Sequence, residues 1–266
     1  MALQHIESLE DSRVQSFRDL KKTNRTRWSG EFIAEGRKVV ERLLESSLEV
    51  RSVLVSERQL HYLPDSPRLD TLNVYVLRDE LACELVGYNF HAGILGCGIR
   101  PANAELAQLC AKSSGLIVAC ERLTDPDNLG TIVRLATGFG ALGLLLSPGC
   151  CDPYSRRTLR VSMGNLLSLS LRESPDFQQE LQLLAKWGWA SVATVLDATA
   201  TPLRQFAGPQ KGVVLLGNEA DGLSLEVVQQ CEHRVTIPMQ GTTDSLNVAL
   251  AAGIVLYELT ADATAE

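Results

Sequence analysis

Short apolar runs alternate along this chain with longer segments in which apolar residues recur at helical spacing. The short runs predict buried β-strands, and the longer segments predict helices with one apolar face. Apolar strands that alternate with helices are typical of an α/β fold whose parallel sheet is covered on both faces. The predicted strands span 52–55, 73–76, 93–99, 116–119, 142–146, 166–171, 191–195, 213–217 and 234–237, and the predicted helices span 35–44, 130–137, 156–162, 177–187 and 248–259.

A break in this alternation divides the chain into two parts. Residues 101–115 interrupt the pattern, so we predict a small α/β domain over 1–100, a linker over 101–115 and a larger domain over 116–266. A chain of 266 residues with 45% hydrophobic content can bury a substantial core.

The N-terminal segment MALQHIESLEDSR is polar and acidic, so we expect no secretory signal. The longest apolar stretch, around 249–257, is too short to span a bilayer. We therefore expect a cytoplasmic protein that does not bind a membrane. The seven cysteines lack CxxC spacing and the four histidines form no spaced cluster, so we expect reduced thiols and no metal site.

The formal net charge of −7 argues against a nucleic-acid partner, because Lys and Arg normally neutralise the phosphates. Residues 1–112 are nearly balanced, however, so most of the excess acid lies in the C-terminal part. The segment RDLKKTNRTR is strongly basic and is followed at once by Trp28. It is either a strip that contacts RNA or a solvated charged face. The residues of this candidate RNA-binding strip are Arg18, Lys21, Lys22, Arg25 and Arg27.

One glycine pattern points toward a different chemistry. Gly138, Gly140 and Gly143 in GFGALG satisfy the GxGxxG spacing of dinucleotide-binding loops. That fingerprint needs a strand before the glycines and a helix after them, whereas here a predicted helix precedes and a predicted strand follows. We interpret these glycines as a helix C-cap and a tight turn into the strand, not as a nicotinamide site.

Three segments place short polar side chains where an apolar strand ends or a helix begins. They are LTDPDNLGTIVRLA (123–136), in which a helix opens after Pro126, VVLLGNEADGL (213–223) and IPMQGTTDSLNVALAAGIVLYEL (237–259). A helix N-terminus offers unpaired N–H groups and a partial positive charge, so such joins can hold a small polar ligand. A capped core helix is the alternative for the last segment.

In order and spacing these segments resemble motifs 1, 2 and 3 of the SpoU (TrmH-like) family of RNA ribose 2′-O-methyltransferases, within the SPOUT superfamily. The matched patterns are NxGxxxR, GNExxGL and IPMxGxxxSLNVxxAAGIxLYEL. A chance match to all three in order is far rarer than a chance match to one. The N-terminal stretch SGEFIAEGRKVVERLLES resembles, less closely, the RNA-binding domain that many members carry.

The resemblance implies a C-terminal parallel-sheet domain with a deep trefoil knot, a rare exception to the unknotted rule. It also implies S-adenosylmethionine as the cofactor, held between the loops of motifs 2 and 3, and a homodimer that packs through the knot region. By motif position, the cofactor-binding residues would be Gly217, Ile237, Met239, Leu246, Leu216 and Gly241.

The same resemblance implies the catalytic residues, which are Arg134, Asn128, Glu219, Ser245 and Asn247. Arg134 would either act as a perturbed base for the ribose hydroxyl or anchor the adjacent phosphate; we favour the second role, because guanidinium is normally always charged. Asn128 would bond to Arg134 or to RNA, and Glu219 would orient Asn128 or Arg134. Ser245 and Asn247 would shape the methyl-transfer pocket.

Each of these residues also has a purely structural alternative. Arg134 can be a surface residue paired with Asp125 or Asp127, Glu219 can link a loop to the backbone, and Asn247 can cap a helix. A cluster formed by Arg156, Arg157 and Arg160 either contacts RNA phosphates or solvates its own helix.

The sequence therefore predicts an RNA ribose 2′-O-methyltransferase that uses S-adenosylmethionine, with rRNA as the first choice of substrate and tRNA as the second. The alternative function is a non-catalytic RNA-binding or ribosome-assembly protein that keeps the knotted fold.

Overall fold

The computed structural model describes residues 3–21, 26–240 and 245–260, except for the side chains of residues 26 and 27. The chain forms two compact units. The first contains Met1–Ala102 and Asp152–Ser168, and the second contains Asn103–Cys151 and Leu169–Glu266. The sequence grouped residues 152–168 with the C-terminal domain, whereas they pack with the N-terminal unit.

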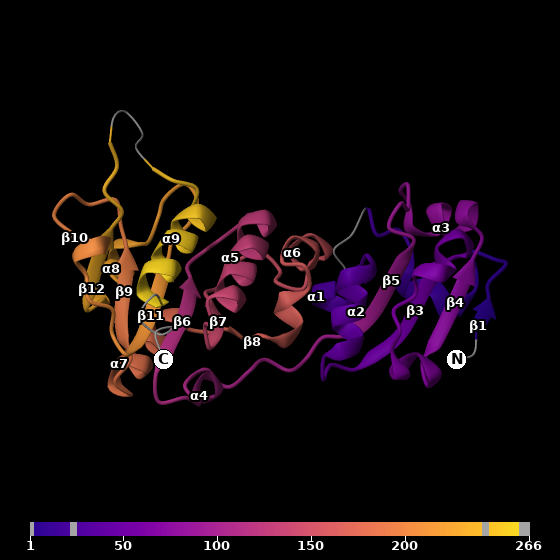
Figure 1. Cartoon of the computed structure of the whole chain (residues 1–266), viewed down its shortest axis with the longest axis horizontal. Helices are drawn as coiled ribbons and strands as arrows, with labels where there is room; N and C mark the ends of the chain where they lie inside the picture. Colours follow the sequence, from indigo (N-terminus) through magenta and orange to yellow (C-terminus); the bar gives the residue numbers. More distant parts are fainter. Residues whose placement is uncertain (1–2, 22–25, 241–244, 261–266) are drawn as a thin grey trace. The chain divides into compact units, whose positions relative to one another are not determined.

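The first unit is built on a mixed five-stranded sheet (Figure 1). Strands β1, β4 and β3 run parallel, and β5 is antiparallel to both β3 and β2. The strands predicted at 52–55, 73–76 and 93–99 are confirmed. The sheet order is β1 (Leu3–His5), β4 (Asn73–Leu77), β3 (Val50–Ser56), β5 (Ile94–Ile99) and β2 (Glu31–Glu35).

Short helices complete the first unit, and the helix predicted at 35–44 is confirmed as α2 (Arg37–Glu45). The strand predicted at 166–171 is wrong over residues 166–169. Ser168 Oγ donates to the carbonyl of Asn165 and closes a 3-10 turn there, so the strand begins at Ser170. The other helical segments are η1 (Ser12–Phe17), α1 (Thr26–Ser29), η2 (Glu57–Tyr62), η3 (Pro67–Asp70), α3 (Asp79–Val86), α6 (Arg156–Val161) and η4 (Asn165–Ser168).

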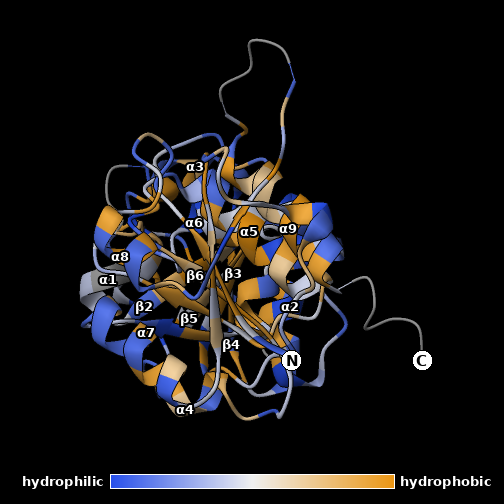
Figure 2. Cartoon of the chain, turned by 90° about the vertical axis from the view of Figure 1, so that its left-hand side faces the viewer, coloured by the Kyte–Doolittle hydropathy of each residue, from blue (hydrophilic) through white to orange (hydrophobic). Residues whose placement is uncertain are grey.

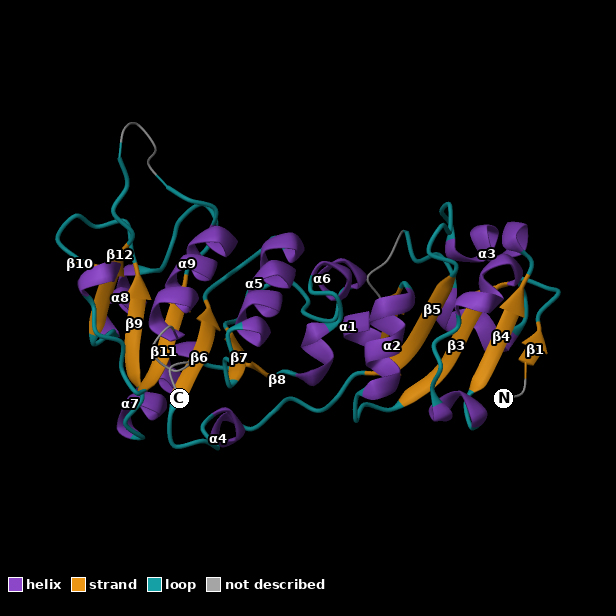
Figure 3. Ribbon diagram, viewed as in Figure 1, coloured by secondary structure: helices purple, strands orange, loops and turns teal. Residues whose placement is uncertain are grey.

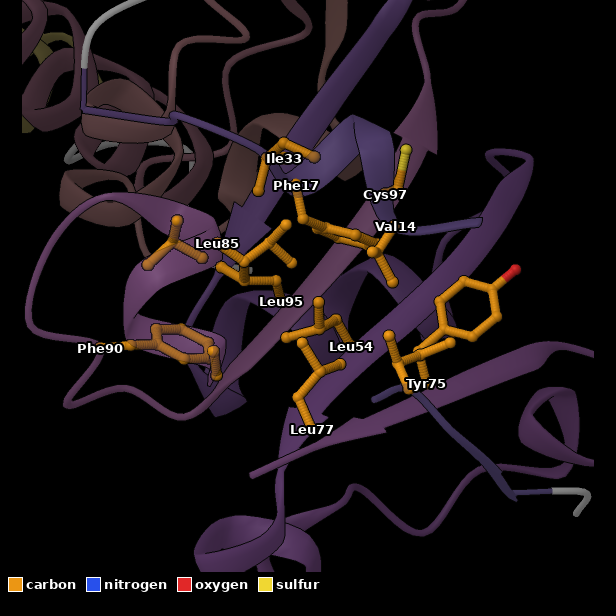
Figure 4. Packing of buried hydrophobic residues seen from close by; sticks show 13 residues of the cluster. Val14, Phe17, Ile33, Leu54, Tyr75, Leu77, Leu85, Phe90, Leu95 and Cys97 are labelled. Atoms are coloured by element: carbon orange, nitrogen blue, oxygen red, sulfur yellow. The ribbon is translucent and has the colours of Figure 1, made fainter. Parts of the chain in front are cut away.

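One cluster of buried side chains in the first unit lies against a face of its sheet. Figure 4 shows Leu54, Leu77 and Leu95 from three strands beside Phe17 and Leu85 from flanking helical segments. Phe17 and Leu54 are fully buried. Burying side chains of this size stabilises a fold by about 1.5–3 kcal/mol each, so the unit has a core of its own.

Arg156 ties the segment 152–168 into the first unit. Its guanidinium donates to a carboxylate oxygen of Glu35 and to the hydroxyl of Tyr88, both at 2.8 Å, and to the carbonyl of Leu20 at 2.6 Å. The Glu35 side chain is buried, so the pair holds a charge that water does not solvate. Of the two roles suggested for the Arg156 cluster, Arg156 itself fits neither, because it is a structural tie.

The second unit is built on a fully parallel seven-stranded sheet with helices on its faces (Figure 3). The α/β class and the parallel sheet are therefore confirmed. The trefoil knot stays a prediction. The sheet order is β10 (Thr201–Pro202), β12 (His233–Thr236), β9 (Ala190–Thr194), β11 (Lys211–Leu216), β6 (Gly115–Cys120), β7 (Gly143–Leu146) and β8 (Ser170–Glu173).

Five α-helices and one 3-10 segment accompany this sheet among the described residues. Strand β6 is coloured hydrophobic in Figure 2, whereas helix α7 shows both colours, as expected for a buried strand and a helix with one wet face. The helical segments are α4 (Leu106–Leu109), α5 (Pro126–Gly138), α7 (Phe177–Lys186), η5 (Leu203–Gln205), α8 (Leu225–Gln230) and α9 (Val248–Thr260).

The GFGALG segment has the structure predicted for it. Helix α5 ends at Gly138, Gly140 adopts a left-handed conformation with φ of 72°, and β7 begins at Gly143. The glycines thus turn the chain from a helix into a strand. All seven cysteines are free thiols. No helix in the described ranges is both long enough and apolar enough to cross a membrane.

Candidate functional site

A cavity of about 490 Å³ opens in the second unit, where four neighbouring parallel strands end. Residues at or just after the ends of β9, β11 and β12 line it, together with the loop that follows β6. The arrowheads of β9 and β6 point to the same edge of the sheet in Figure 3. Ligands of open α/β sheets bind at the carboxyl ends of the strands, so this is the expected place for one.

Gly217 forms a part of the wall that no other residue can form. A Cβ atom at this position would lie 2.2 Å from the backbone carbon of Gly222 and 2.2 Å from the nitrogen of Leu223. The backbone of Asn218 pairs with that of Gly222 through two hydrogen bonds of 3.0 Å. The loop therefore folds back onto the end of β11, and its backbone stays accessible beside the cavity.

Glu219 clasps the motif 2 loop to the motif 1 loop. Its Oε1 accepts hydrogen bonds from the backbone N–H of Asp125 at 2.9 Å and from Nδ2 of Asn128 at 3.1 Å. Its Oε2 accepts from the backbone N–H and the hydroxyl of Thr124, both at 3.2 Å. All these partners donate, so the site requires an ionised carboxylate here.

Asn128 and Asn247 extend the clasp to the third motif. Nδ2 of Asn247 donates to Oδ1 of Asn128 at 2.8 Å, and Oδ1 of Asn247 accepts from the backbone N–H of Ala249 at 2.9 Å. Asn247 therefore caps helix α9 and orients Asn128 at the same time. A single chain of hydrogen bonds joins motif 2, motif 1 and motif 3 through Glu219, Asn128 and Asn247.

The ionisation of Glu219 follows from its surroundings. Burial raises the pKa of Glu219, but the hydrogen bonds donated by the Asp125 N–H and the Asn128 amide outweigh this, and the net pKa is lowered. Because the folded-state pKa is lowered, the stabilisation by this clasp is present at neutral pH and is lost as the pH falls through the folded value.

Most of the predicted site residues meet at this cavity. The sequence predicted Asn128 or Arg134 as the partner of Glu219. The structure shows a hydrogen bond between Glu219 and Asn128, and a second one between Asn128 and Asn247. Two predicted cofactor residues are not among the lining residues. Leu216 is buried within β11, and Gly241 lies outside the described residues. The predicted residues that line the cavity are Asn128, Gly217, Glu219, Ile237, Met239, Ser245, Leu246 and Asn247.

Arg134 lies apart from the cavity-lining residues. It is exposed on α5, more than one turn beyond Asn128. Arg134 is therefore a surface residue of this helix, and its part in the reaction stays a prediction.

Sequence reasoning missed one wall of the cavity. Thr194, Val195 and Leu196 line it, and none belongs to a recognised motif. They follow β9, which lies between β12 and β11 in the sheet. The strand itself was predicted, but its place between the motif 2 and motif 3 strands was not, and that place is what brings these residues to the site.

The candidate RNA-binding strip is described only in part. The Arg18 guanidinium donates to the carbonyl of Leu9, so it is engaged within its own unit. Lys21 is exposed, and Trp28 is 88% exposed. Lys22 and Arg25 lie outside the described residues, and the Arg27 side chain is likewise not described. RNA binding by this strip stays a prediction.

The described residues contain no group of three or more His, Cys, Asp or Glu side chains that could hold a metal ion. The polar groups of the cavity are hydroxyls, amides, carboxylates and backbone. Such a site suits an organic ligand with several hydrogen-bonding groups.

Known proteins are similar in sequence to this chain over most of its length. The model of the SpoU rRNA Methylase family matches residues 115–257. An uncharacterized tRNA/rRNA methyltransferase from Mycobacterium bovis is 31% identical over 258 residues, which cover 94% of this chain and 89% of the relative. This chain belongs to the SpoU family. The recognition of the family from its three motifs is confirmed.

A solved structure agrees with the sequence comparison. The rRNA methyltransferase from Sinorhizobium meliloti, crystallised with S-adenosylmethionine bound, superposes with a TM-score of 0.85 at 26% identity and covers 98% of both chains. A 23S rRNA (uridine(2479)-2′-O)-methyltransferase from Streptomyces viridochromogenes is 29% identical, covering 89% of this chain and 84% of the relative. These comparisons confirm the prediction of an RNA methyltransferase that uses S-adenosylmethionine as its cofactor.

The residues of this SpoU protein fit that cofactor. A volume of about 490 Å³ lies within the ~300–1,000 Å³ of ordinary ligand sites. Ile237, Met239 and Leu246 would supply apolar surface for a purine ring, and the Gly217 backbone would approach a ligand without a side chain between them. The methionine part carries charged groups that would need the polar side of the cavity.

Proposed function

We propose that this SpoU protein methylates the 2′-hydroxyl of a ribose in RNA, with rRNA as the first choice of substrate and tRNA as the second. The observation that carries the proposal is the single hydrogen-bond chain from Glu219 through Asn128 to Asn247, which assembles all three motifs around one cavity. The relative from Streptomyces viridochromogenes, named a 23S rRNA 2′-O-methyltransferase, supports both the ribose hydroxyl and rRNA. Such a substrate implies a cytoplasmic protein.

The proposed reaction needs alignment more than acid assistance. When bound, S-adenosylmethionine supplies a methyl group on a positively charged sulfur that leaves as a neutral thioether. The protein must hold the acceptor oxygen in line with that carbon, and fixed geometry of this kind can supply several kcal/mol of the barrier. Glu219, Asn128 and Asn247 hold the loops that define the geometry, because each side chain is fixed by at least two hydrogen bonds.

Ser245 and Thr124 place hydroxyl groups at the same cavity. A hydroxyl can donate a hydrogen bond and accept one, so either group can position a ribose oxygen without removing its proton. We assign them positioning roles in the methyl-transfer pocket.

Arg134 serves the reaction as an RNA anchor in this proposal. Its place on the exposed side of α5, outside the cavity lining, suits a contact with a phosphate next to the methylated ribose. Guanidinium stays charged in proteins, which favours phosphate binding over proton removal. The N-terminal unit would add further RNA contacts.

The Arg134→Ala variant tests this role. We expect methylation to fall by ~10²–10⁴, while the affinity for S-adenosylmethionine in calorimetry stays unchanged. Arg134→Lys should recover only part of the loss, because an ammonium keeps the charge but lacks the planar pair of N–H groups with which guanidinium binds phosphate. Unchanged methylation by the alanine variant would remove Arg134 from the mechanism, whereas an inactive wild-type protein would favour the non-catalytic alternative.

We also propose that the protein acts as a homodimer through α9. One face of this helix is apolar and exposed, since Leu250, Ile254 and Tyr257 are 62%, 43% and 63% exposed and lie at helical spacing. The opposite face carries the buried residues Ala249, Ala252, Val255 and Leu256, and α9 packs beside α5. A helix that is apolar all round normally has both faces covered, so a second copy fits the open face.

Replacing Ile254 with arginine should abolish that dimer, because the variant would place an unpaired charge in an apolar interface. Sedimentation velocity should then show a monomer for Ile254→Arg. The matched control is Leu225→Arg, which changes another exposed leucine on α8, 74% exposed, and should leave the dimer intact. A dimeric Ile254→Arg variant would exclude this face as the interface.

A further inference from the structure

Methylation of a ribose hydroxyl releases one proton, so a group that accepts the proton must lie beside the hydroxyl. This requirement rests on the proposed function. The described residues that line the cavity include no histidine, lysine or cysteine. Two of them carry carboxylates, Asp125 and Glu219. Among the described residues, the candidates for the acceptor are therefore these two side chains.

Glu219 is already committed to the protein. Its oxygens accept from the Asp125 N–H, the Asn128 amide, and the N–H and hydroxyl of Thr124. Burial raises the pKa of Glu219, but these hydrogen bonds lower it by more. A carboxylate stabilised in this way is a poor proton acceptor, and taking up a proton would break the clasp between the loops.

Asp125 is held in place by one oxygen only. It is the N-cap of α5, and its Oδ1 accepts the backbone N–H of Asp127 at 2.8 Å. In the described part of the chain no donor is bonded to Oδ2. The Asp125 N–H is fixed by Glu219, so the backbone and one carboxylate oxygen are anchored while the other oxygen is open beside the cavity.

We propose that Asp125 is a further catalytic residue, the proton acceptor for the 2′-hydroxyl of the RNA. Its Oδ2 first accepts the hydrogen bond of that hydroxyl. The ribose oxygen then gains a bond to the methyl carbon, the carbon–sulfur bond breaks with its electron pair staying on sulfur, and the hydroxyl proton passes to Oδ2. Water later removes the proton from Asp125, which restores the carboxylate.

A carboxylate is strong enough for this task. The proton of a hydroxyl becomes strongly acidic as its oxygen forms a third bond, so the transfer occurs late, and a weak base in the correct position is sufficient. The acceptor must lie within hydrogen-bonding distance of the hydroxyl, and an anchored N-cap meets that condition better than a mobile surface side chain. This step also leaves Arg134 free to hold phosphate as a permanent cation.

Asparagine and serine at position 125 separate catalysis from helix capping. Both residues cap helices well, so Asp125→Asn and Asp125→Ser should keep the thermal stability and the affinity for S-adenosylmethionine. Neither can accept a full proton. We expect single-turnover methylation of RNA at saturating cofactor to fall by ~10²–10⁴ in both variants.

The matched control is Asp127→Asn, which removes a neighbouring acid in the first turn of α5 that does not line the cavity. Its rate should stay within about threefold of wild type. An Asp125→Asn rate within the same range would overturn the proposal. A loss of cofactor affinity in both variants would also overturn it, because Asp125 would then act only as the cap that holds the helix and the cavity in place. If the wild type itself methylates no ribose, the proposed function fails as well; an active wild type with an active Asp125→Asn variant rejects Asp125 alone.

Discussion

Asn128→Asp should reduce kcat/KM for RNA methylation by roughly a hundredfold, or about 3 kcal/mol of transition-state stabilisation. Asn128 donates to Oε1 of Glu219 at 3.1 Å and accepts from Asn247 at 2.8 Å, so the site uses both ends of its amide. Aspartate has the same shape but no donor. It would place a second carboxylate oxygen against Glu219, and the two negative charges would repel each other. Among the described residues, the link from Glu219 through residue 128 to Asn247 would then be broken.

The control for this variant is Asn73→Asp in the first unit. The Oδ1 of Asn73 accepts a hydrogen bond from Gln4 at 2.9 Å, and an aspartate oxygen can do the same. Its activity should equal that of wild type. Wild-type kinetics for Asn128→Asp would show that the chain of hydrogen bonds does not organise the site.

Gly217→Ala should abolish measurable binding of S-adenosylmethionine in calorimetry and lower Tm by roughly 5 °C. The added Cβ would lie 2.2 Å from two backbone atoms, at Gly222 and Leu223, and backbone cannot rotate away as a side chain can. The end of β11 would have to move, and with it the wall of the cavity.

Gly138→Ala is the matched control, since it adds the same methyl group in open space within α5. It should leave cofactor binding unchanged and keep or slightly raise Tm, because alanine reduces the freedom of the unfolded chain. If Gly217→Ala bound the cofactor as wild type does, the folded-back loop would not define the site.

The sequence predicted those features that depend on neighbours along the chain. Asn128, Glu219 and Asn247 were recognised because each follows a strand or opens a helix in a short motif, and the structure brings all three together. The parallel sheet was likewise predicted from the runs of apolar residues, because strands buried on both faces have no polar alternation.

Features that depend on three-dimensional order were not predictable in this way. The wall formed by Thr194, Val195 and Leu196 arises from the position of β9 between β12 and β11, and the hydrophobic pattern of a strand does not encode its neighbours. The short strands β1 and β2 were missed because β1 has three residues and β2 begins and ends with glutamate.

The packing of residues 152–168 with the first unit also depends on partners that are distant in sequence. Arg156 meets Glu35, which lies 121 positions earlier, and the arginine-rich sequence shows no sign of that buried acid. A charged cluster in a sequence has the same appearance whether it is solvated, bound to RNA or paired.

Transfer of labelled methyl groups from S-adenosylmethionine into rRNA and tRNA, followed by nuclease digestion and identification of the modified nucleoside, tests the proposed activity most directly. We expect label at a ribose 2′-oxygen, in the rRNA fraction and absent from the tRNA fraction. Ribose label in tRNA alone would keep the reaction and correct the substrate. Label on a base, or no label in either fraction despite bound cofactor, would contradict the ribose methyltransferase assignment.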